Sequence, residues 1–297
     1  SGPEYLLFYF QRKSILTIFL SILFGIIVFY LLSTFVLSFV VQRIPRNPIT
    51  DKPDWGRVID TRIPAIDNGS LEVWRVEPAG VSRGIIVFAH GWGRNRDRMV
   101  FRARLFAGLG FTTIMHSARD HGGSSKVFLV NAVKFAEDIE TVLKWIGEPV
   151  DLYGHSAGAA GAIIAAHRNP EKIRRLFLEA SYADTKEGLL SLYRWANRFF
   201  GIVIGPMIIF WWNLFYPGAM DQYSPANLAP DLHMPVMIIH GEKDQRFPVA
   251  FAHTLKHRFP TNKVDMYVAP GVDHSDASHT PGYMTAVRSF LNRYGEE

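Results

Sequence analysis

The longest apolar run in the chain lies near the N-terminus. Residues 14–41 contain no charged side chain and consist mainly of Ile, Leu, Phe and Val. A helix needs about 20 such residues to cross a bilayer, and the short apolar core and small-residue cleavage site of a secretory signal peptide are missing. The pattern predicts a retained transmembrane helix over residues 14–41. It follows a tail, residues 1–13, whose Ser1-Gly2-Pro3 resembles an expression scar.

Downstream, the apolar residues form short runs separated by glycine, proline and polar residues. The runs have the length of buried strands and lie at residues 85–89, 111–115, 149–153, 175–178, 236–240 and 264–268. Residues 157–167 are rich in alanine and glycine, as expected of a helix packed closely on a sheet. We therefore expect an α/β domain over residues 58–297, joined to the membrane helix by a stiff, proline-containing linker over residues 42–57.

Composition and charge limit the classes of binding partner that the sequence suggests. The 297 residues carry a formal net charge of +5, which suits anionic lipid headgroups, and no nucleic-acid recognition motif is evident. The chain has no cysteine, so disulfides are excluded. Arg12 and Lys13 precede the apolar run, and four basic residues follow it at positions 43, 46, 52 and 57. This count favours, by a small margin, a single-pass protein whose C-terminal domain lies on the cytoplasmic side.

The motif Gly154-His155-Ser156-Ala157-Gly158 directs attention to enzymatic chemistry. It stands between a predicted strand and a predicted helix, the setting in which such a turn exposes a serine hydroxyl for nucleophilic attack. The backbone amide of Ala157 and the positive end of the helix would then face the position of a developing oxyanion. A purely structural turn is the alternative interpretation.

A serine needs a base and a group that orients the base. Asp244 follows the predicted strand at residues 236–240, and His274 follows the one at residues 264–268. Glu242 or Asp273 is an alternative acid, and His279 is an alternative base. A metal site at Asp273, His274, Asp276 and His279 is disfavoured, and we expect neither metal nor cofactor.

The order Ser156, Asp244, His274 at successive strand ends resembles that of the α/β-hydrolase family. The resemblance covers residues 58–295 and implies a mostly parallel sheet flanked by helices, with Ser156 as nucleophile, His274 as base and Asp244 as orienting acid. By the same resemblance, the backbone amide of Trp92, in the segment His90-Gly91-Trp92-Gly93, is the second oxyanion donor. The loop Arg119-Asp120-His121-Gly122-Gly123-Ser124 departs from the family's usual order, so we assign it no catalytic role.

The family often carries a cap between the two strands that flank residues 184–230. Here residues 199–215 are uncharged and interrupted by glycine and proline, which predicts a re-entrant or interfacial lid. The side chains expected to contact lipid are Phe199, Phe200, Phe210, Trp211, Trp212 and Phe215. An ordinary apolar cap packed on the core is the alternative.

Together these features predict a membrane-anchored serine hydrolase that cleaves carboxylic esters or thioesters of lipid-like acyl groups. An acyltransferase would use the same residues, and a serine peptidase is disfavoured because nothing specifies an amine-binding site. A catalytically silent lipid-binding or scaffold protein is the alternative outside enzymology.

Overall fold

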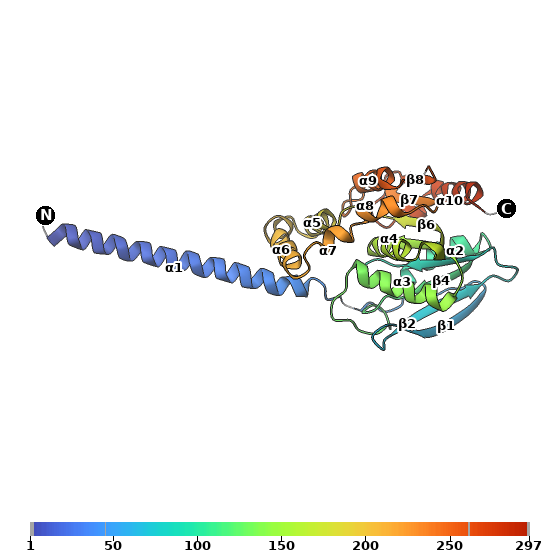
Figure 1. Ribbon diagram of the computed structural model, residues 1–297, viewed down its shortest axis with the longest axis horizontal. Coiled ribbons are helices and arrows are strands. Elements are labelled where there is room, and N and C mark those ends of the chain that lie inside the picture. Colours follow the sequence, from blue (N-terminus) through green and yellow to red (C-terminus); the bar gives the residue numbers. More distant parts are fainter. Residues whose placement is uncertain (1–2, 45, 261, 296–297) are drawn as a thin grey trace.

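A computed structural model describes residues 3–44, 46–260 and 262–295 of the chain (Figure 1). It begins with the long helix α1, Pro3–Val40, which extends away from the rest of the chain. Within the described residues, one helix is long and apolar enough to cross a bilayer, and it occupies Arg12–Val40 of α1. The prediction for residues 14–41 thus falls on an apolar helix.

The rest of the chain is built on one eight-stranded sheet in the order β1-β2-β4-β3-β5-β6-β7-β8. The strands are β1 Arg57–Pro64, β2 Ser70–Glu77, β3 Ile85–Ala89, β4 Thr112–His116, β5 Val150–His155, β6 Ile173–Glu179, β7 Val236–Gly241 and β8 Val264–Ala269. β2 is antiparallel to β1 and β4, and the strands from β4 to β8 are parallel. The predicted mostly parallel sheet is confirmed.

Helices cover both faces of the sheet. The main ones are α2 Val100–Ala107, α3 Ala132–Ile146, α4 Ala157–Arg168, α9 Ala250–Arg258 and α10 Pro281–Arg293. Short 3-10 turns occupy Arg96–Met99, Pro170–Lys172, Ala229–Asp231 and Ala277–His279. Side chains of α3, α4 and α9 pack on one face and those of α2 and α10 on the other.

The alternation of side chains along the strands explains this two-sided core. In β5, Val150 and Leu152 belong to the face under α3 and α4, whereas Tyr153 belongs to the opposite face. In β3, Val87 and Phe88 divide in the same way. Because successive strand residues point to opposite sides, a fully apolar strand demands cover on both faces, and the parallel strands end together at one edge.

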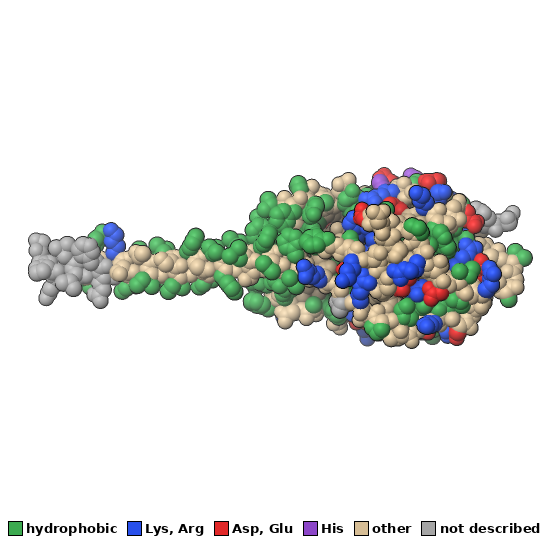
Figure 2. Space-filling view, turned by 90° about the horizontal axis from the view of Figure 1, so that it is seen from below, with side chains coloured by type: hydrophobic (Ala, Val, Ile, Leu, Met, Phe, Trp, Pro, Cys, Tyr) green, Lys and Arg blue, Asp and Glu red, His purple; other side chains and the backbone are tan. Residues whose placement is uncertain are grey.

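The segment between β6 and β7 forms a helical cap. It comprises α5 Thr185–Ala196, a π-helical turn Phe200–Ile204, α6 Gly205–Phe215, α7 Ala219–Gln222 and α8 Pro225–Leu228. Figure 1 shows α6 beside the end of α1 where the chain enters the domain. In Figure 2, apolar side chains cover α1 and the adjoining part of the molecule, while charged side chains gather farther along the domain.

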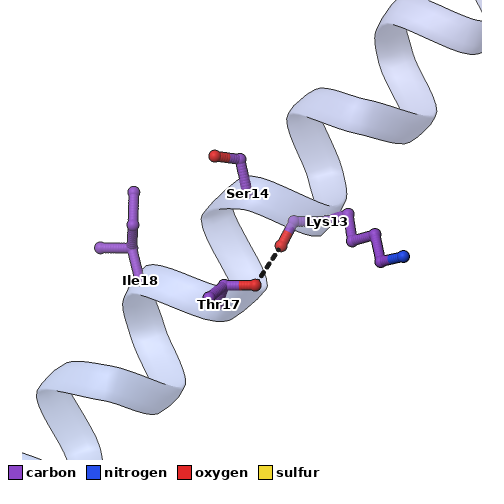
Figure 3. A pocket seen from close by; sticks show the side chains of 4 residues that line it. All are labelled: Lys13, Ser14, Thr17 and Ile18. Carbon is purple, nitrogen blue, oxygen red and sulfur yellow. Dashed lines mark hydrogen bonds between the residues drawn. The ribbon is translucent and has the colours of Figure 1, made fainter.

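A shallow hollow lies on the N-terminal part of α1, beside Lys13, Ser14, Thr17 and Ile18 (Figure 3). The hydroxyl of Thr17 donates a 2.9 Å hydrogen bond to the carbonyl oxygen of Lys13 within the helix. The hollow has no second element opposite it, and the helix extends away from the domain here (Figure 1). We assign it no part in the chemistry.

Candidate active site

Ser156 stands at the sharp turn between β5 and α4. Its backbone has φ 57° and ψ −120°, a conformation that costs a non-glycine residue about 1–3 kcal/mol and persists where its surroundings enforce it. A Cβ atom on Gly154 would lie 2.5 Å from the Cα of Ala159, and one on Gly158 would lie 2.4 Å from the carbonyl oxygen of His90. Both glycines are therefore needed to hold α4 against the strands.

Three side chains from separate loops meet at the ends of the parallel strands. The Nε2 atom of His274 lies 2.9 Å from the Oγ atom of Ser156. The Nδ1 atom of the same His274 ring lies 2.7 Å from the Oδ2 atom of Asp244. In this geometry the carboxylate favours the imidazole tautomer with a proton on Nδ1, which leaves Nε2 free to accept the serine proton.

The loops after β7 and β8 meet because Gly241 ends β7. A Cβ atom there would lie 2.5 Å from the carbonyl oxygen of Asp273. The amide of Lys243 donates to the carbonyl oxygen of Val272, and the amide of Gln245 donates to the Asp273 side chain. These bonds hold the loop of Asp244 against the loop of His274.

The alternative acids and base have other partners in the structure. Asp273 accepts hydrogen bonds from the amides of Gln245 and His274, and Glu242 accepts one from the amide of Gly271. The ring of His279 stacks on Phe101, with 4.1 Å between the ring centroids. Within the part of the chain that the structure describes, no group of three or more His, Asp or Glu side chains is arranged to hold a metal ion.

Asp244 is buried yet remains charged. Burial alone would raise the pKa of its carboxyl group, but hydrogen bonds involving His240, His274 and the Phe247 amide outweigh burial and hold that pKa well below 3.8. Its Oδ1 atom accepts from the amides of Arg246 and Phe247, each at 2.9 Å. A permanent negative charge therefore faces the imidazole of His274.

Two further histidines at the site are held neutral. Burial lowers the pKa of His90 and of His155 well below 6.5. The Nε2 atom of His90 accepts a hydrogen bond from the amide of Ala118, and its Nδ1–H can donate to the carbonyl oxygen of Gly91. Both rings are therefore packed, buried side chains of the turns that carry them.

The loop after β3 lies directly against the Ser156 turn. A Cβ atom on Gly91 would lie 3.0 Å from the Cβ of Ser156. The next residue, Trp92, packs in a cluster with Ala157. Ala157 is the first residue of α4, so its amide has no acceptor within the helix. The segment that carries Trp92 thus lies against the turn that carries Ser156 and Ala157, and the role of the two amides stays a prediction.

Comparisons with known proteins show what the chain is similar to. Residues 80–212 match the family described as serine aminopeptidase, S33. The monoacylglycerol lipase of Mycolicibacterium smegmatis is 24% identical over 241 residues, which cover 68% of this chain and 84% of the relative. The chain has the α/β-hydrolase fold. Its sequence is similar to those of serine hydrolases, among them a lipase and an esterase.

Solved structures extend the likeness in fold. The Pyrococcus furiosus esterase Pf2001 superimposes on this α/β-hydrolase with a TM-score of 0.68 at 18% identity, over 85% of this chain and 99% of the other. A structure titled as a membrane phospholipase A, a bacterial virulence factor, has a TM-score of 0.59 at 15% identity. That match covers 98% of this chain and 99% of the other, so it includes the N-terminal helix.

The sequence reasoning missed a buried network that braces the site. Arg102 in α2 forms two 2.5 Å hydrogen bonds with the carboxylate of Glu179 and donates to the carbonyl oxygen of Ser275 at 3.0 Å. The backbone oxygen of Glu179 accepts from the amide of Ser156. One ion pair therefore connects the serine turn with the residue after His274. In the sequence, the only indication of this network was Glu179, a glutamate at the end of an apolar strand.

The hydrolase also has a support for the loop after β3 that the sequence did not reveal. The amide of Gly93 donates to Nε2 of His121 at 3.2 Å, and Nδ1–H of His121 can donate to the carbonyl oxygen of Arg119. The side-chain amide of Asn47, in the linker, donates to the carbonyl oxygen of Gly93. The loop of residues 119–124 and the linker therefore both hold the segment that carries Trp92.

The apolar cap residues divide into two groups. Phe199 and Phe210 are 69% and 50% exposed, whereas Phe200 packs against Tyr193 of α5. The indole N–H groups of Trp211 and Trp212 donate to Thr34 Oγ1 and Ser38 O of α1, both at 3.0 Å, and Phe215 stacks edge-on against Phe35. Cap and apolar N-terminal helix therefore form one packed unit.

Proposed function

We propose that this α/β-hydrolase is a membrane-anchored enzyme that cleaves carboxylic esters or thioesters of lipid-like acyl groups. The observation that carries the lipid part of the proposal is the packing of cap helix α6 on the last turns of α1. In a bilayer-anchored protein, this packing holds the apolar cap at the membrane surface. An acyl chain that leaves the lipid phase then meets the cap before it meets water.

The length of α1 supports this placement. Its 29 apolar-segment residues, Arg12–Val40, extend about 43 Å at 1.5 Å per residue, whereas the hydrocarbon core is about 30 Å thick. If Arg12 and Lys13 lie in the far headgroup layer, the length of helix that exceeds the hydrocarbon core lies at the domain end of α1. Thr34 and Ser38, which bind the two indoles, would then lie near the interface, where Trp is favoured.

The cap reaches the proposed catalytic residues through α5. Leu192 of α5 packs in a cluster with Phe247, and the ring of Phe247 lies edge-on to His274 at 5.2 Å between centroids. Trp195 of α5 lies under the guanidinium of Arg246, two residues after Asp244. Cap position and the geometry of the acid and base loops are therefore linked.

The mechanism uses Ser156, His274 and Asp244. The Oγ atom of Ser156 attacks the acyl carbonyl while Nε2 of His274 takes its proton, and Asp244 stabilises the resulting imidazolium. The amides of Trp92 and Ala157 stabilise the oxyanion. Collapse breaks the bond to the alcohol or thiol, which leaves with the proton from His274. Water then attacks the acyl-enzyme with His274 as base, and the acid is released.

The names of the relatives point to the same substrate class. One is a monoacylglycerol lipase and another is titled a membrane phospholipase A. Both names refer to acyl esters of glycerol lipids. The excess of basic residues after α1 favours the cytoplasmic side for the domain, which protease protection in sealed vesicles would test.

The test is hydrolysis of a series of esters of rising acyl length by the full chain in detergent micelles, with Ser156→Ala as the blank. The proposal expects kcat/KM to rise from short into long acyl chains and to vanish in the blank. Activity confined to short esters would remove the lipid substrate and leave an ordinary cap. Lack of activity at every length, with lipid binding retained, would favour the transferase or scaffold alternatives.

A further inference from the structure

A groove with basic walls lies where the N-terminal helix gives way to the domain. It has a volume of about 550 Å³ and is lined by Arg43, Ile44, Arg46, Asp120, Lys126, Val127 and Phe128. One wall is the linker that follows α1, and the other is the loop between β4 and α3. We call it the basic groove. Its first residue comes three positions after the last residue of α1.

The charges of the basic groove are not balanced within the protein. Arg43, Arg46 and Lys126 supply three positive charges and Asp120 one negative charge, a surplus of two. Asp120 is 3.6 Å from Arg46, whose guanidinium also donates to the carbonyl oxygen of Gly122. Among the residues that the structure describes, Arg43 and Lys126 form no salt bridge. They are free to bind a doubly or singly charged anion.

The apolar side of the basic groove adjoins the segments that carry Trp92 and Ala157. Ile44 and Val127 pack in the same cluster as Trp92 and Ala157, the two proposed oxyanion donors. The methyl Cγ2 of Ile44 would lie 3.5 Å from a Cβ on Gly93. At the outer rim, the ring of Phe128 is 76% exposed. A ligand in the groove thus has a charged end at the cations and an apolar end towards Ser156.

We propose that the basic groove binds the phosphate of a glycerophospholipid or lysophospholipid whose acyl ester is presented to Ser156. The inference rests on the proposed function and adds its headgroup specificity. Arginine and lysine are the usual protein partners of phosphate. In a chain anchored by α1, the groove lies within the headgroup layer, because Arg43 follows the apolar helix so closely. Exposed Phe128 would enter the interface beside it.

The test compares two substrates with the same acyl chain, oleoyl lysophosphatidylglycerol and monooleoylglycerol. Each is presented in nonionic dodecyl maltoside micelles that hold the full chain, because a phosphatidylcholine matrix would itself bring phosphate to the groove. Wild type is expected to prefer the phosphate-bearing substrate. In Arg43→Gln/Lys126→Gln, the ratio of the two kcat/KM values should fall about tenfold or more, as expected for losing charge-assisted bonds. Monooleoylglycerol hydrolysis should stay unchanged.

The matched control is Lys256→Gln/Arg258→Gln. It removes the same two residue types from the exposed surface of α9, where neither side chain forms a salt bridge within the described residues. This control should keep the wild-type ratio. The single variant Lys126→Glu, with its melting temperature measured alongside, repeats the test without the double change.

The outcomes separate the claims. An unchanged ratio in the groove variant, or an equal fall for both substrates, would overturn the groove as a phosphate site while the hydrolase proposal stands. Failure of wild type on both substrates would instead contradict the proposed function. Inhibition by inorganic phosphate that disappears in the groove variant, together with an unchanged substrate ratio in that variant, would show that the groove takes free phosphate and would overturn a lipid as its source.

Discussion

Replacing Asp244 with Asn probes the proposed triad at one atom. In the native site, Oδ1 accepts from the amides of Arg246 and Phe247, and Oδ2 lies 2.7 Å from Nδ1 of His274. The carboxamide oxygen of Asn should keep the two backbone bonds, which places its NH2 group against His274. That group donates, so Nδ1 must become the acceptor and the imidazole proton moves to Nε2, facing Ser156.

The expected loss follows from this tautomer. With a proton on Nε2, the imidazole cannot accept the serine proton, and loss of the orienting carboxylate in a triad lowers kcat by about 10⁴. This factor corresponds to about 5.4 kcal/mol of activation free energy at 1.36 kcal/mol per tenfold. The backbone bonds of the loop are kept, so folding should be preserved.

The assay is hydrolysis of p-nitrophenyl butyrate by the full chain in detergent micelles, together with a thermal melt. Glu242→Gln and Asp273→Asn are the matched controls, because each carboxylate bonds backbone amides near the site. Both should retain activity within a few-fold of wild type. An Asp244→Asn enzyme within about tenfold of wild type, or a control that loses as much as Asp244→Asn, would refute this assignment of the acid.

Four further outcomes follow from the structure. Gly158→Ala places a Cβ against the backbone oxygens of Ala89 and His90 and should lower the melting temperature by several degrees, since overpacking costs about 1–3 kcal/mol, whereas Gly80→Ala, with open space around it, should not. Arg102→Met leaves Glu179 buried and unpaired and should cost about 3–5 kcal/mol in urea unfolding, while Lys186→Met at an exposed pair changes little. The pKa of Asp244 is lowered on folding, so its ionisation stabilises the protein above about pH 4, and this contribution is lost as pH falls from there through the lowered pKa. The difference in free energy of unfolding between wild type and Asp244→Asn should therefore shrink below about pH 4 and stay constant above about pH 5. Trp211→Phe removes the indole donor to Thr34 and should speed amide exchange in α6 while short-ester hydrolysis holds, and unchanged exchange would contradict the packed unit of cap and helix.

The sheet and the serine turn could be predicted because local sequence decides them. Strands such as residues 85–89 are apolar at every position, which requires cover on both faces. Gly154 is demanded by backbone contacts within the turn itself, whereas Gly158 is demanded by the backbone of Ala89 and His90 at the end of the neighbouring strand β3. Asp244 and His274 were identified because strand ends lie together in a parallel sheet.

Other features depend on contacts between segments far apart in the chain. Thr34 and Ser38 lie four residues apart on one face of α1, but short hydroxyl side chains can bond within their own helix, so the sequence does not show that this face receives Trp211 and Trp212. Arg102 and Glu179 are charged, and charge in a sequence pattern indicates a solvated position, yet the pair is buried. The contact of Asn47 with Gly93 depends on how the linker folds back, which the prolines do not specify.

The most direct test of the central claim is covalent labelling of the full, bilayer-reconstituted chain with a long-chain fluorophosphonate, followed by peptide mass spectrometry. The account predicts one adduct, on Ser156, that is absent in Ser156→Ala and is slowed in Asp244→Asn in proportion to its loss of esterase activity. A reactive serine elsewhere, or lipid-ester hydrolysis that persists in Ser156→Ala, would contradict it.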